Sequence, residues 1–82
     1  MEIRILFLGE LGARFGRAHV LEAGEAVTVG DLRQRIGEQV KGSASSLMRP
    51  DVRLVVDQIV EPESALVRSG QEIAVLPLYS GG

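Results

Sequence analysis

The sequence predicts an α+β domain, in which a mixed sheet of four to five strands carries one main helix across one face. Three observations lead to this fold class. The chain has 82 residues, enough for one hydrophobic core and too few for two. Apolar residues alternate with period two near both ends of the chain, as in β-strands. Only one long segment has its apolar residues at helical spacing.

The first strand is predicted at residues 2–8, where Ile3, Ile5 and Phe7 alternate with a second set of side chains. The shorter elements expected after it are a helical segment at 11–15, a strand at 18–21, a hairpin at 52–56 and 59–60, a helical turn at 64–67 and a last strand at 72–76. Both terminal strands are strongly apolar, so we expect them to lie side by side at the centre of the sheet.

The main helix is predicted at residues 29–40. Its apolar side chains share one helical face: Val29, Leu32, Ile36 and Val40. Thr28 is a favourable N-cap, and Asp31 in the first turn suits the positive end of the helix dipole. Gly37 lies inside this helix and costs about 1 kcal/mol relative to alanine. Residues 42–49, which follow, have the most loop-like composition of the chain.

Composition and charge exclude several kinds of site. The net charge is −2, and the eight arginines are scattered, so we expect no nucleic acid and no membrane as partner. The chain has no cysteine and a single histidine, His19, which excludes thiolate and histidine-cluster metal sites. No apolar run could span a membrane, and the first residues do not resemble a signal peptide, so a cytoplasmic location is expected.

A single helix covers one face of a sheet, so the other face should carry exposed apolar side chains. If Ile3, Ile5 and Phe7 point toward the helix, their neighbours point away from it. The expected members of this apolar docking patch are Leu6, Leu8, Val60, Leu76 and Leu78. The alternative is that residues 42–49 or the short helical segment cover them.

The ending Ser80-Gly81-Gly82 is the candidate chemical site. Pro77 ends the last strand, which predicts a domain at residues 1–77 and a flexible tail at 78–82. Five extended residues reach about 17 Å, enough to bridge a domain surface and a buried active site. Glycine has no Cβ, so Gly81 would give the clearance that lets the Gly82 carboxylate enter a narrow channel.

A carboxylate is a poor electrophile at neutral pH, and conversion to an acyl adenylate with ATP would activate it. A sulfur donor could then displace the adenylate and leave a thiocarboxylate on Gly82. The chain itself offers no obvious acid, base or metal site for these steps, so we expect it to be non-catalytic alone and to bind no cofactor. Tyr79 is either an aromatic anchor at the mouth of such a channel or a residue that packs within the tail.

The sequence resembles the MoaD-like small subunit of molybdopterin synthase, within the MoaD/ThiS sulfur-carrier family, over essentially the whole chain. The segments that carry the resemblance are I-R-I-L-F-L at the start, T-V-G-D-L-R at the helix start, V-V-D-Q-I-V in the hairpin and S-G-Q-E-I-A-V-L-P-L-Y-S-G-G at the end. It departs from the family pattern at Leu78, where a second proline is usual, and at Asp57, where the turn is usually asparagine-based.

The resemblance implies the ubiquitin-like β-grasp fold and a reaction cycle. A ubiquitin-activating-like adenylyltransferase would use ATP to adenylate Gly82, and a sulfurtransferase system would supply sulfur. The thiocarboxylated tail would then enter the large subunit of molybdopterin synthase and donate sulfur for the dithiolene of the molybdenum cofactor. Two small subunits typically flank a dimer of large ones, which gives a heterotetramer.

Three other functions remain open at this stage. A thiamine-pathway sulfur carrier would use the same tail, although such chains are typically shorter and lack a helix between the first two strands. A ubiquitin-like protein modifier would also use the adenylate but would end on a target lysine. A plain interaction domain would need no acyl chemistry at all, and removal of Gly82 would then leave its function intact.

Overall fold

The computed structural model of the chain describes residues 1–78. The helices and strands in these residues are β1 (Glu2–Phe7), α1 (Glu10–Phe15), β2 (Ala18–Glu22), β3 (Val27–Thr28), α2 (Val29–Gln39), α3 (Ala44–Leu47), β4 (Val52–Val56), β5 (Ile59–Val60), β6 (Leu66–Val67) and β7 (Ile73–Pro77). The sequence predicted seven of these elements, with bounds that differ by at most one or two residues: β1, α1, β2, α2, β4, β5 and β7.

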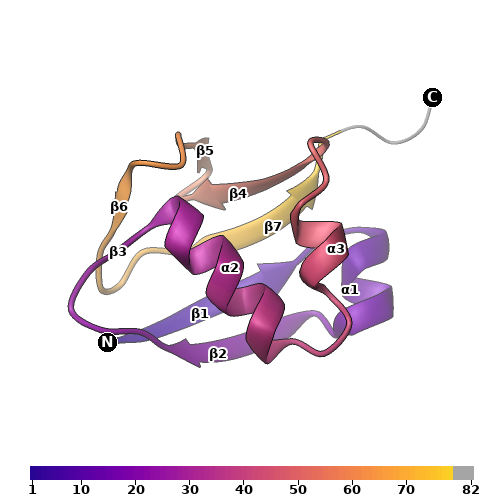
Figure 1. The fold of residues 1–82 in the computed structure, drawn as a ribbon, viewed down its shortest axis with the longest axis horizontal. Helices are drawn as coiled ribbons and strands as arrows, with labels where there is room; N and C mark the ends of the chain where they lie inside the picture. The colour runs from indigo at the N-terminus through magenta and orange to yellow at the C-terminus, as the bar shows by residue number, and fades with distance from the viewer. Residues whose placement is uncertain (79–82) are drawn as a thin grey trace.

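The main sheet has five strands in the order β2-β1-β7-β4-β5. The first and last strands, β1 and β7, are parallel neighbours near its centre, and the other pairs are antiparallel. Figure 1 shows β7 between β1 and β4, with α2 in front of them. The predicted mixed sheet and the central pairing of the terminal strands are therefore confirmed, and the architecture is the β-grasp arrangement.

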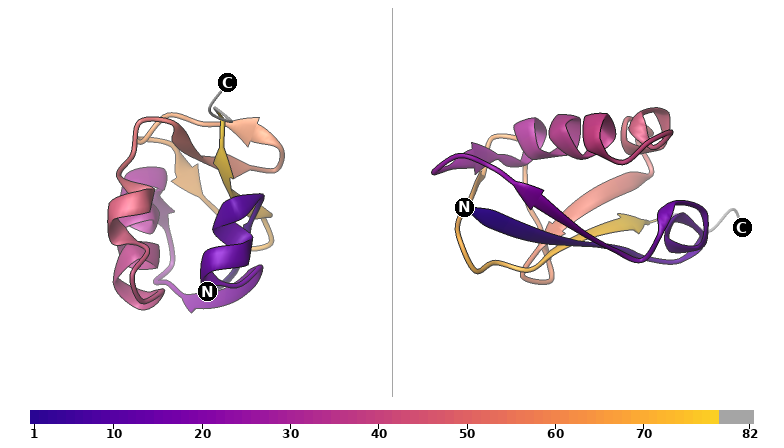
Figure 2. Two further views of the ribbon diagram at one scale, coloured as in Figure 1. Left: turned by 90° about the vertical axis from the view of Figure 1, so that its right-hand side faces the viewer. Right: turned by 90° about the horizontal axis from the view of Figure 1, so that it is seen from below.

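The core lies between the sheet and α2. Every second residue of β1 is buried, and α2 contributes a face whose side chains are fully buried. The most enclosed core residues of these two elements and of β7 are Ile3, Ile5, Phe7, Val29, Leu32, Ile36, Ile73 and Val75. Figure 2 shows α2 and α3 together on one side of the sheet, with α1 at its end. The predicted inward and outward parity of the terminal strands is confirmed.

Local signals explain how α2 begins and why it contains a glycine. The Thr28 hydroxyl accepts a hydrogen bond from the Asp31 N–H at 3.1 Å, as expected of an N-cap. A Cβ at Gly37 would lie 3.1 Å from the Cα of Ala44. The helical cost of this glycine is thus offset by the close approach that it permits between α2 and α3.

Two local predictions are wrong. Residues 42–49, expected as a loop, contain helix α3, because Leu47 is buried and α3 packs against α2. Residues 64–67, expected as a helical turn, contain strand β6, which pairs with β3 in a small second sheet. Both elements are too short to show a period, and tertiary contacts form them where local propensity does not.

The predicted hairpin turn at Asp57-Gln58 is confirmed, and the structure explains its aspartate. Both residues have positive φ, 49° and 69°, as a two-residue hairpin turn requires. The Asp57 carboxylate accepts the Glu72 N–H at 2.8 Å and a Gln71 side-chain N–H at 3.3 Å. A residue that is weaker than asparagine as a turn former is thus stabilised by contacts with the segment before β7.

Candidate functional site

The sheet face that points away from α2 carries an unbroken apolar row. Register places Leu6 of β1 opposite Ala18 of β2 on one side and Ala74 of β7 on the other. Ala74 in turn lies opposite Val55, which lies opposite Val60. Side chains at paired positions share one face, so this row crosses all five strands of the sheet.

The five residues predicted for the docking patch all lie on or beside this row. The exposed fractions are 36% for Leu6, 37% for Leu8, 50% for Val60 and 52% for Leu78, and Leu76 is half-buried. Neither segment proposed as a cover lies over them: α3 packs against α2, and α1 lies at the end of the sheet (Figure 2). In the part of the chain described, Leu6, Leu8, Val60 and Leu78 on this face are exposed to solvent, whereas Val55 at the centre of the row is only 8% exposed.

The structure adds three apolar residues to this face that the sequence pattern did not indicate: Ala18, Val55 and Ala74. Only strand register reveals them, because it sets which residues are adjacent across strands. The tight turn at residues 57–58 supplied part of that signal, since a two-residue turn places Val55 opposite Val60.

Charged side chains border the apolar row along the strands. Arg53 lies opposite Leu76 on the side where β7 ends. Arg4 lies opposite Val20 on the other side, in a hollow of about 390 Å³ that Glu2 and Glu72 also line. An apolar centre with a charged border is the usual composition of a protein-binding surface.

The end of β7 fixes where the chain leaves the sheet. The pairing of β7 with β1 stops at Val75, whereas its pairing with β4 continues to Pro77. The N–H of Leu78 then donates to the carbonyl of Asp51 at 2.7 Å. The predicted site residues Tyr79, Gly81 and Gly82 lie outside the described residues.

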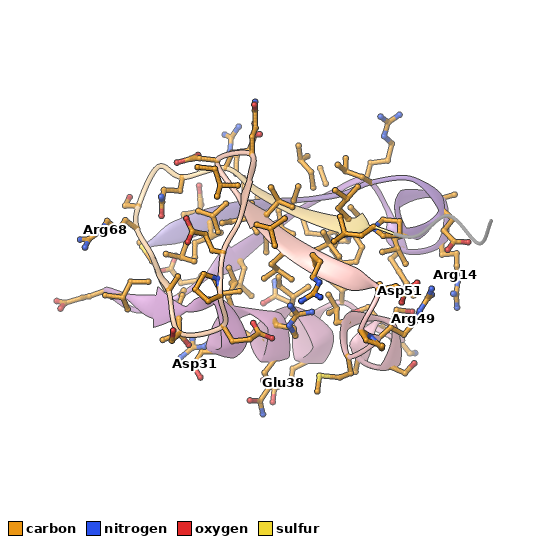
Figure 3. The ribbon with its side chains drawn as sticks, turned by 90° about the horizontal axis from the view of Figure 1, so that it is seen from above. Arg14, Asp31, Glu38, Arg49, Asp51 and Arg68 are labelled. Atoms are coloured by element: carbon orange, nitrogen blue, oxygen red, sulfur yellow. The ribbon has the colours of Figure 1, made fainter. Side chains whose placement is uncertain are left out.

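An ion pair lies beside this exit point. Arg49 donates from Nε and Nη2 to the two carboxylate oxygens of Asp51, at 3.0 and 2.6 Å. These hydrogen bonds hold the pKa of the Asp51 carboxyl below its ordinary value and raise the pKa of Arg49. Figure 3 shows both residues, with Arg14, at the end of the molecule where β7 stops.

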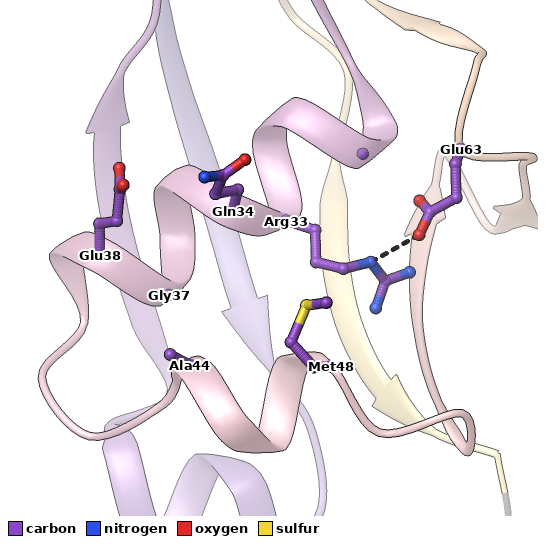
Figure 4. A pocket seen from close by; sticks show the side chains of 8 residues that line it. Arg33, Gln34, Gly37, Glu38, Ala44, Met48 and Glu63 are labelled. Carbon is purple, nitrogen blue, oxygen red and sulfur yellow. Dashed lines mark hydrogen bonds and ion pairs between the residues drawn. The ribbon is translucent and has the colours of Figure 1, made fainter.

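A second hollow, of about 470 Å³, lies on the opposite side of the molecule between α2 and α3 (Figure 4). Arg33 and Glu63 form an ion pair at one side of it, with Nε and Oε1 2.9 Å apart. Arg33 also donates from Nη1 to the carbonyls of Leu47 and Val52, at 2.7 and 3.1 Å. Since Arg33 holds the α3 region to α2 and β4, its role here is structural.

The single histidine also has a structural place. The Nε2 atom of His19 lies 2.9 and 3.1 Å from the carbonyl oxygens of Phe15 and Gly16, at the end of α1. Its ring packs edge-on against Phe7, with ring centroids 5.1 Å apart. This geometry makes His19 the donor that satisfies the last carbonyls of the short helix.

Among residues 1–78, no group of three or more His, Asp or Glu side chains could hold a metal ion. None of the helices within those residues is long and apolar enough to cross a membrane. The described features that point to function are thus the open apolar face and the exit of β7 beside it.

Comparison with known proteins gives the family. A family model described as the ThiS family matches residues 5–82. Among curated protein sequences, none matches the chain. Solved structures match its fold over nearly the full length. SAMP1 from Haloferax volcanii has a TM-score of 0.87 at 17% identity and covers 100% of both chains.

A second structural match is a putative molybdopterin converting factor, subunit 1, from Pyrococcus furiosus. Its TM-score is 0.81 at 15% identity, over 96% of this chain and 99% of that one. At such low identity, these two matches establish the ubiquitin-like fold. The family model covers almost the whole sequence, including the Gly81-Gly82 ending, and the chain therefore belongs to the ThiS family, within the MoaD/ThiS group of sulfur carriers.

Proposed function

We propose that this chain is the sulfur carrier of a molybdopterin synthase, its small subunit, and that the Gly82 carboxylate carries the sulfur as a thiocarboxylate. The observation that supports this most strongly is the course of β7. This central strand leaves the sheet toward Gly81-Gly82 at the border of the open apolar face. One surface can therefore bind a partner enzyme while the tail enters the partner's active site.

The proposed chemistry takes place on the tail, with ATP supplied to a ubiquitin-activating-like adenylyltransferase. A Gly82 carboxylate oxygen attacks the α-phosphorus of ATP, and pyrophosphate leaves. A hydrosulfide ion (HS⁻) released by the donor system then attacks the acyl carbon, forming the C–S bond, and AMP leaves with the former carboxylate oxygen. The product is a thiocarboxylate whose sulfur can be transferred, and hydrolysis returns the carboxylate to Gly82.

The proposed docking surface is the open apolar face. Its centre is apolar, its border carries Arg4 and Arg53, and Leu78 lies at the exit of the tail. We propose that the large subunit of molybdopterin synthase covers this face, in a heterotetramer with two carriers, and that the adenylyltransferase uses the same face at a different step. Tyr79 would then lie at the entrance to the partner's channel.

The choice of pathway rests on chain architecture. Helix α1 between the first two strands and helix α3 before β4 lengthen the chain relative to typical thiamine-pathway carriers. They favour the molybdopterin branch over the thiamine branch, which uses the same tail chemistry. The structural match to a putative molybdopterin converting factor subunit is consistent with this choice.

A protein modifier is the second candidate function. Its support is the fold match to SAMP1, which a further solved structure names a small archaeal modifier protein. In that case the activated Gly82 would form an isopeptide bond with a lysine of another protein. Lys41 is the single lysine of this chain, so self-linked chains through lysine side chains would have only one acceptor site.

Intact mass spectrometry of the protein from its native cell tests the proposal. A fraction whose mass differs by exchange of one oxygen for sulfur, with the change located at Gly82, is the expected result. A Gly-Gly remnant on lysines of other proteins would instead favour the modifier function. An unmodified Gly82 in growing cells, together with no adenylate formation in the presence of the activating enzyme, would refute both.

Deletion of Gly82 is the matched test in vitro. The shortened chain should keep its fold and its binding to the large subunit, because the docking face is unchanged. It should lose ATP-dependent activation completely, because no carboxylate reaches the adenylylation site. If the shortened chain replaces the full-length protein in the cell without loss of function, a plain interaction domain is supported instead.

A further inference from the structure

We infer that the ion pair between Arg49 and Asp51 is a positioning element for the tail. The pair holds the turn that contains Asp51, and the backbone carbonyl of Asp51 accepts the N–H of Leu78. Leu78 is the last described residue before the Gly-Gly ending. This inference rests on the proposed function, because it concerns where the Gly82 carboxylate is delivered. Neither residue would touch the reacting atoms, and both would act through Leu78.

The last residues of β7 form ladder pairs with β4 and not with β1. The ladder between β7 and β1 stops at Val75, and Pro77 has no N–H to donate. The neighbour on the β1 side is Gly9, where a Cβ would lie 3.6 Å from the proline ring. The hydrogen bond from Leu78 to Asp51 therefore has a large influence on the direction in which the chain continues.

The acceptor carbonyl belongs to a turn that the ion pair closes. The N–H of Val52 donates to the carbonyl of Arg49 at 3.1 Å, with Pro50 at the centre of this turn. The Arg49 guanidinium spans the same turn and binds both oxygens of Asp51. Such a two-point contact restricts rotation of both side chains more than a single hydrogen bond does.

The backbone of Arg49 also connects this turn to the helical layer. The N–H of Arg49 donates to the carbonyl of Ser46 in α3 at 3.2 Å. Glu10 of α1 adds a favourable charge that acts on Arg49. The turn that receives Leu78 is thus connected by a backbone hydrogen bond to α3, one of the two segments that lengthen the chain between its main strands.

The length of the tail makes its starting direction important. If a partner's channel holds the four residues beyond Leu78 extended, they would span about 13 Å, and a 20° change in the starting direction would displace the far end by about 4–5 Å. Acyl transfer requires the reacting atoms to lie about 3–3.5 Å apart in a defined orientation. A wider range of starting directions would lower the fraction of docked carriers whose carboxylate reaches the site.

A role as an anion-binding site fits the geometry less well. Two of the guanidinium nitrogens of Arg49 already bind Asp51, whose carboxylate would repel an anion, and Glu10 lies near enough to act on the same arginine. Although the Arg49 side chain is 40% exposed, its described hydrogen bonds are made with Asp51 across the turn.

The test compares Arg49→Gln with wild type in adenylate formation by the activating enzyme, using the full chain. The expected result is a decrease of about tenfold in kcat with KM changed less than about twofold. The variant should still dock on the enzyme, but its Gly82 carboxylate should reach the active site less often. Arg49→Lys keeps the charge and loses the two-point contact, so its kcat should lie between those of wild type and Arg49→Gln. Amide hydrogen exchange at Leu78 in the free protein should be faster in Arg49→Gln.

Ile3→Val is the control, since it removes one buried methyl group from the core near the start of β1, at the opposite end of that strand from Gly9 and Leu78. It should lower the unfolding temperature and leave kcat and Leu78 exchange unchanged, which separates positioning from stability. Asp51→Asn replaces Arg49→Gln if that variant does not fold. Unchanged kcat and unchanged Leu78 exchange would overturn the inference. If the wild-type chain is not activated, the proposed function fails. The amide exchange rate of Leu78 still tests whether the Arg49–Asp51 ion pair holds the start of the tail.

Discussion

The two faces of the sheet are built from the same strands and similar residues, yet they differ in what covers them. Ile5 and Val75 point toward α2 and are 1% and 0% exposed. Leu6, adjacent to Ile5 in sequence, is 36% exposed. Because α2 and α3 both pack on one side, the other side keeps apolar area available for a partner. Alternate residues of one strand therefore lie in the core and on the face that we propose as the docking surface.

The largest expected effect is a loss of stability from substitutions on the sheet face that packs against α2. Ile5→Ala should lower the free energy of unfolding by about 2–5 kcal/mol, because the deleted atoms leave a cavity in the core. Leu6→Ala on the same strand is the matched control and should cost about 1 kcal/mol or less. Urea denaturation of both variants measures the contrast. Equal losses would show that the two faces do not divide the roles.

A polar contact on the helical side should give the next largest effect. Arg33→Gln removes the ion pair with Glu63 and can leave the carbonyls of Leu47 and Val52 without a partner. The expected loss is about 1–3 kcal/mol of unfolding free energy. Arg35→Gln, on the exposed side of the same helix, should have little effect. A change in partner binding by Arg33→Gln, without loss of stability, would contradict the structural role.

The open face should respond in binding, with little change in stability. Leu8→Asp should weaken binding to the large subunit by about tenfold or more, because a charge enters the desolvated contact. Its control is Ile59→Asp: Ile59 is 58% exposed and lies opposite the core residue Val56, so it is outside the apolar row. Calorimetric titration of both variants gives the two affinities. An unchanged affinity for Leu8→Asp would remove this surface as the docking site.

The smallest effect concerns the pH dependence of the Arg49–Asp51 pair. The pKa of Asp51 is lowered in the folded state from its ordinary value of 3.8 by the hydrogen bond from Arg49. The pair's contribution to stability is therefore fully present well above pH 3.8 and is lost as the pH falls through the lowered pKa.

An NMR titration of the Asp51 carboxyl carbon checks this shift. Arg49→Gln should move the Asp51 pKa up toward its ordinary value, because the charged hydrogen-bond donor is gone. An Asp51 pKa that does not move in Arg49→Gln would show that the pair does not form in solution.

The fold and the candidate site were predictable from the sequence to different degrees. Period-two and helical spacing gave β1, β7 and α2, because these elements are long enough to repeat their pattern. Helix α3 and strand β6 were missed, since four and two residues show no period and form only through contacts with α2 and β3. Gly37, costly in an isolated helix, became explicable only with Ala44 beside it.

For the site, the sequence by itself indicated the chemical group that we propose to react and determined the parity of the strands. The Gly81-Gly82 ending and the absence of cysteine direct the sulfur hypothesis to one carboxylate, and alternation separates Leu6 from Ile5. The tertiary structure decided the rest. Strand register assembled Ala18, Leu6, Ala74, Val55 and Val60 into one row, and the turn at residues 49–52 met the end of β7. Both depend on pairing between residues that are distant in sequence, which local patterns do not encode.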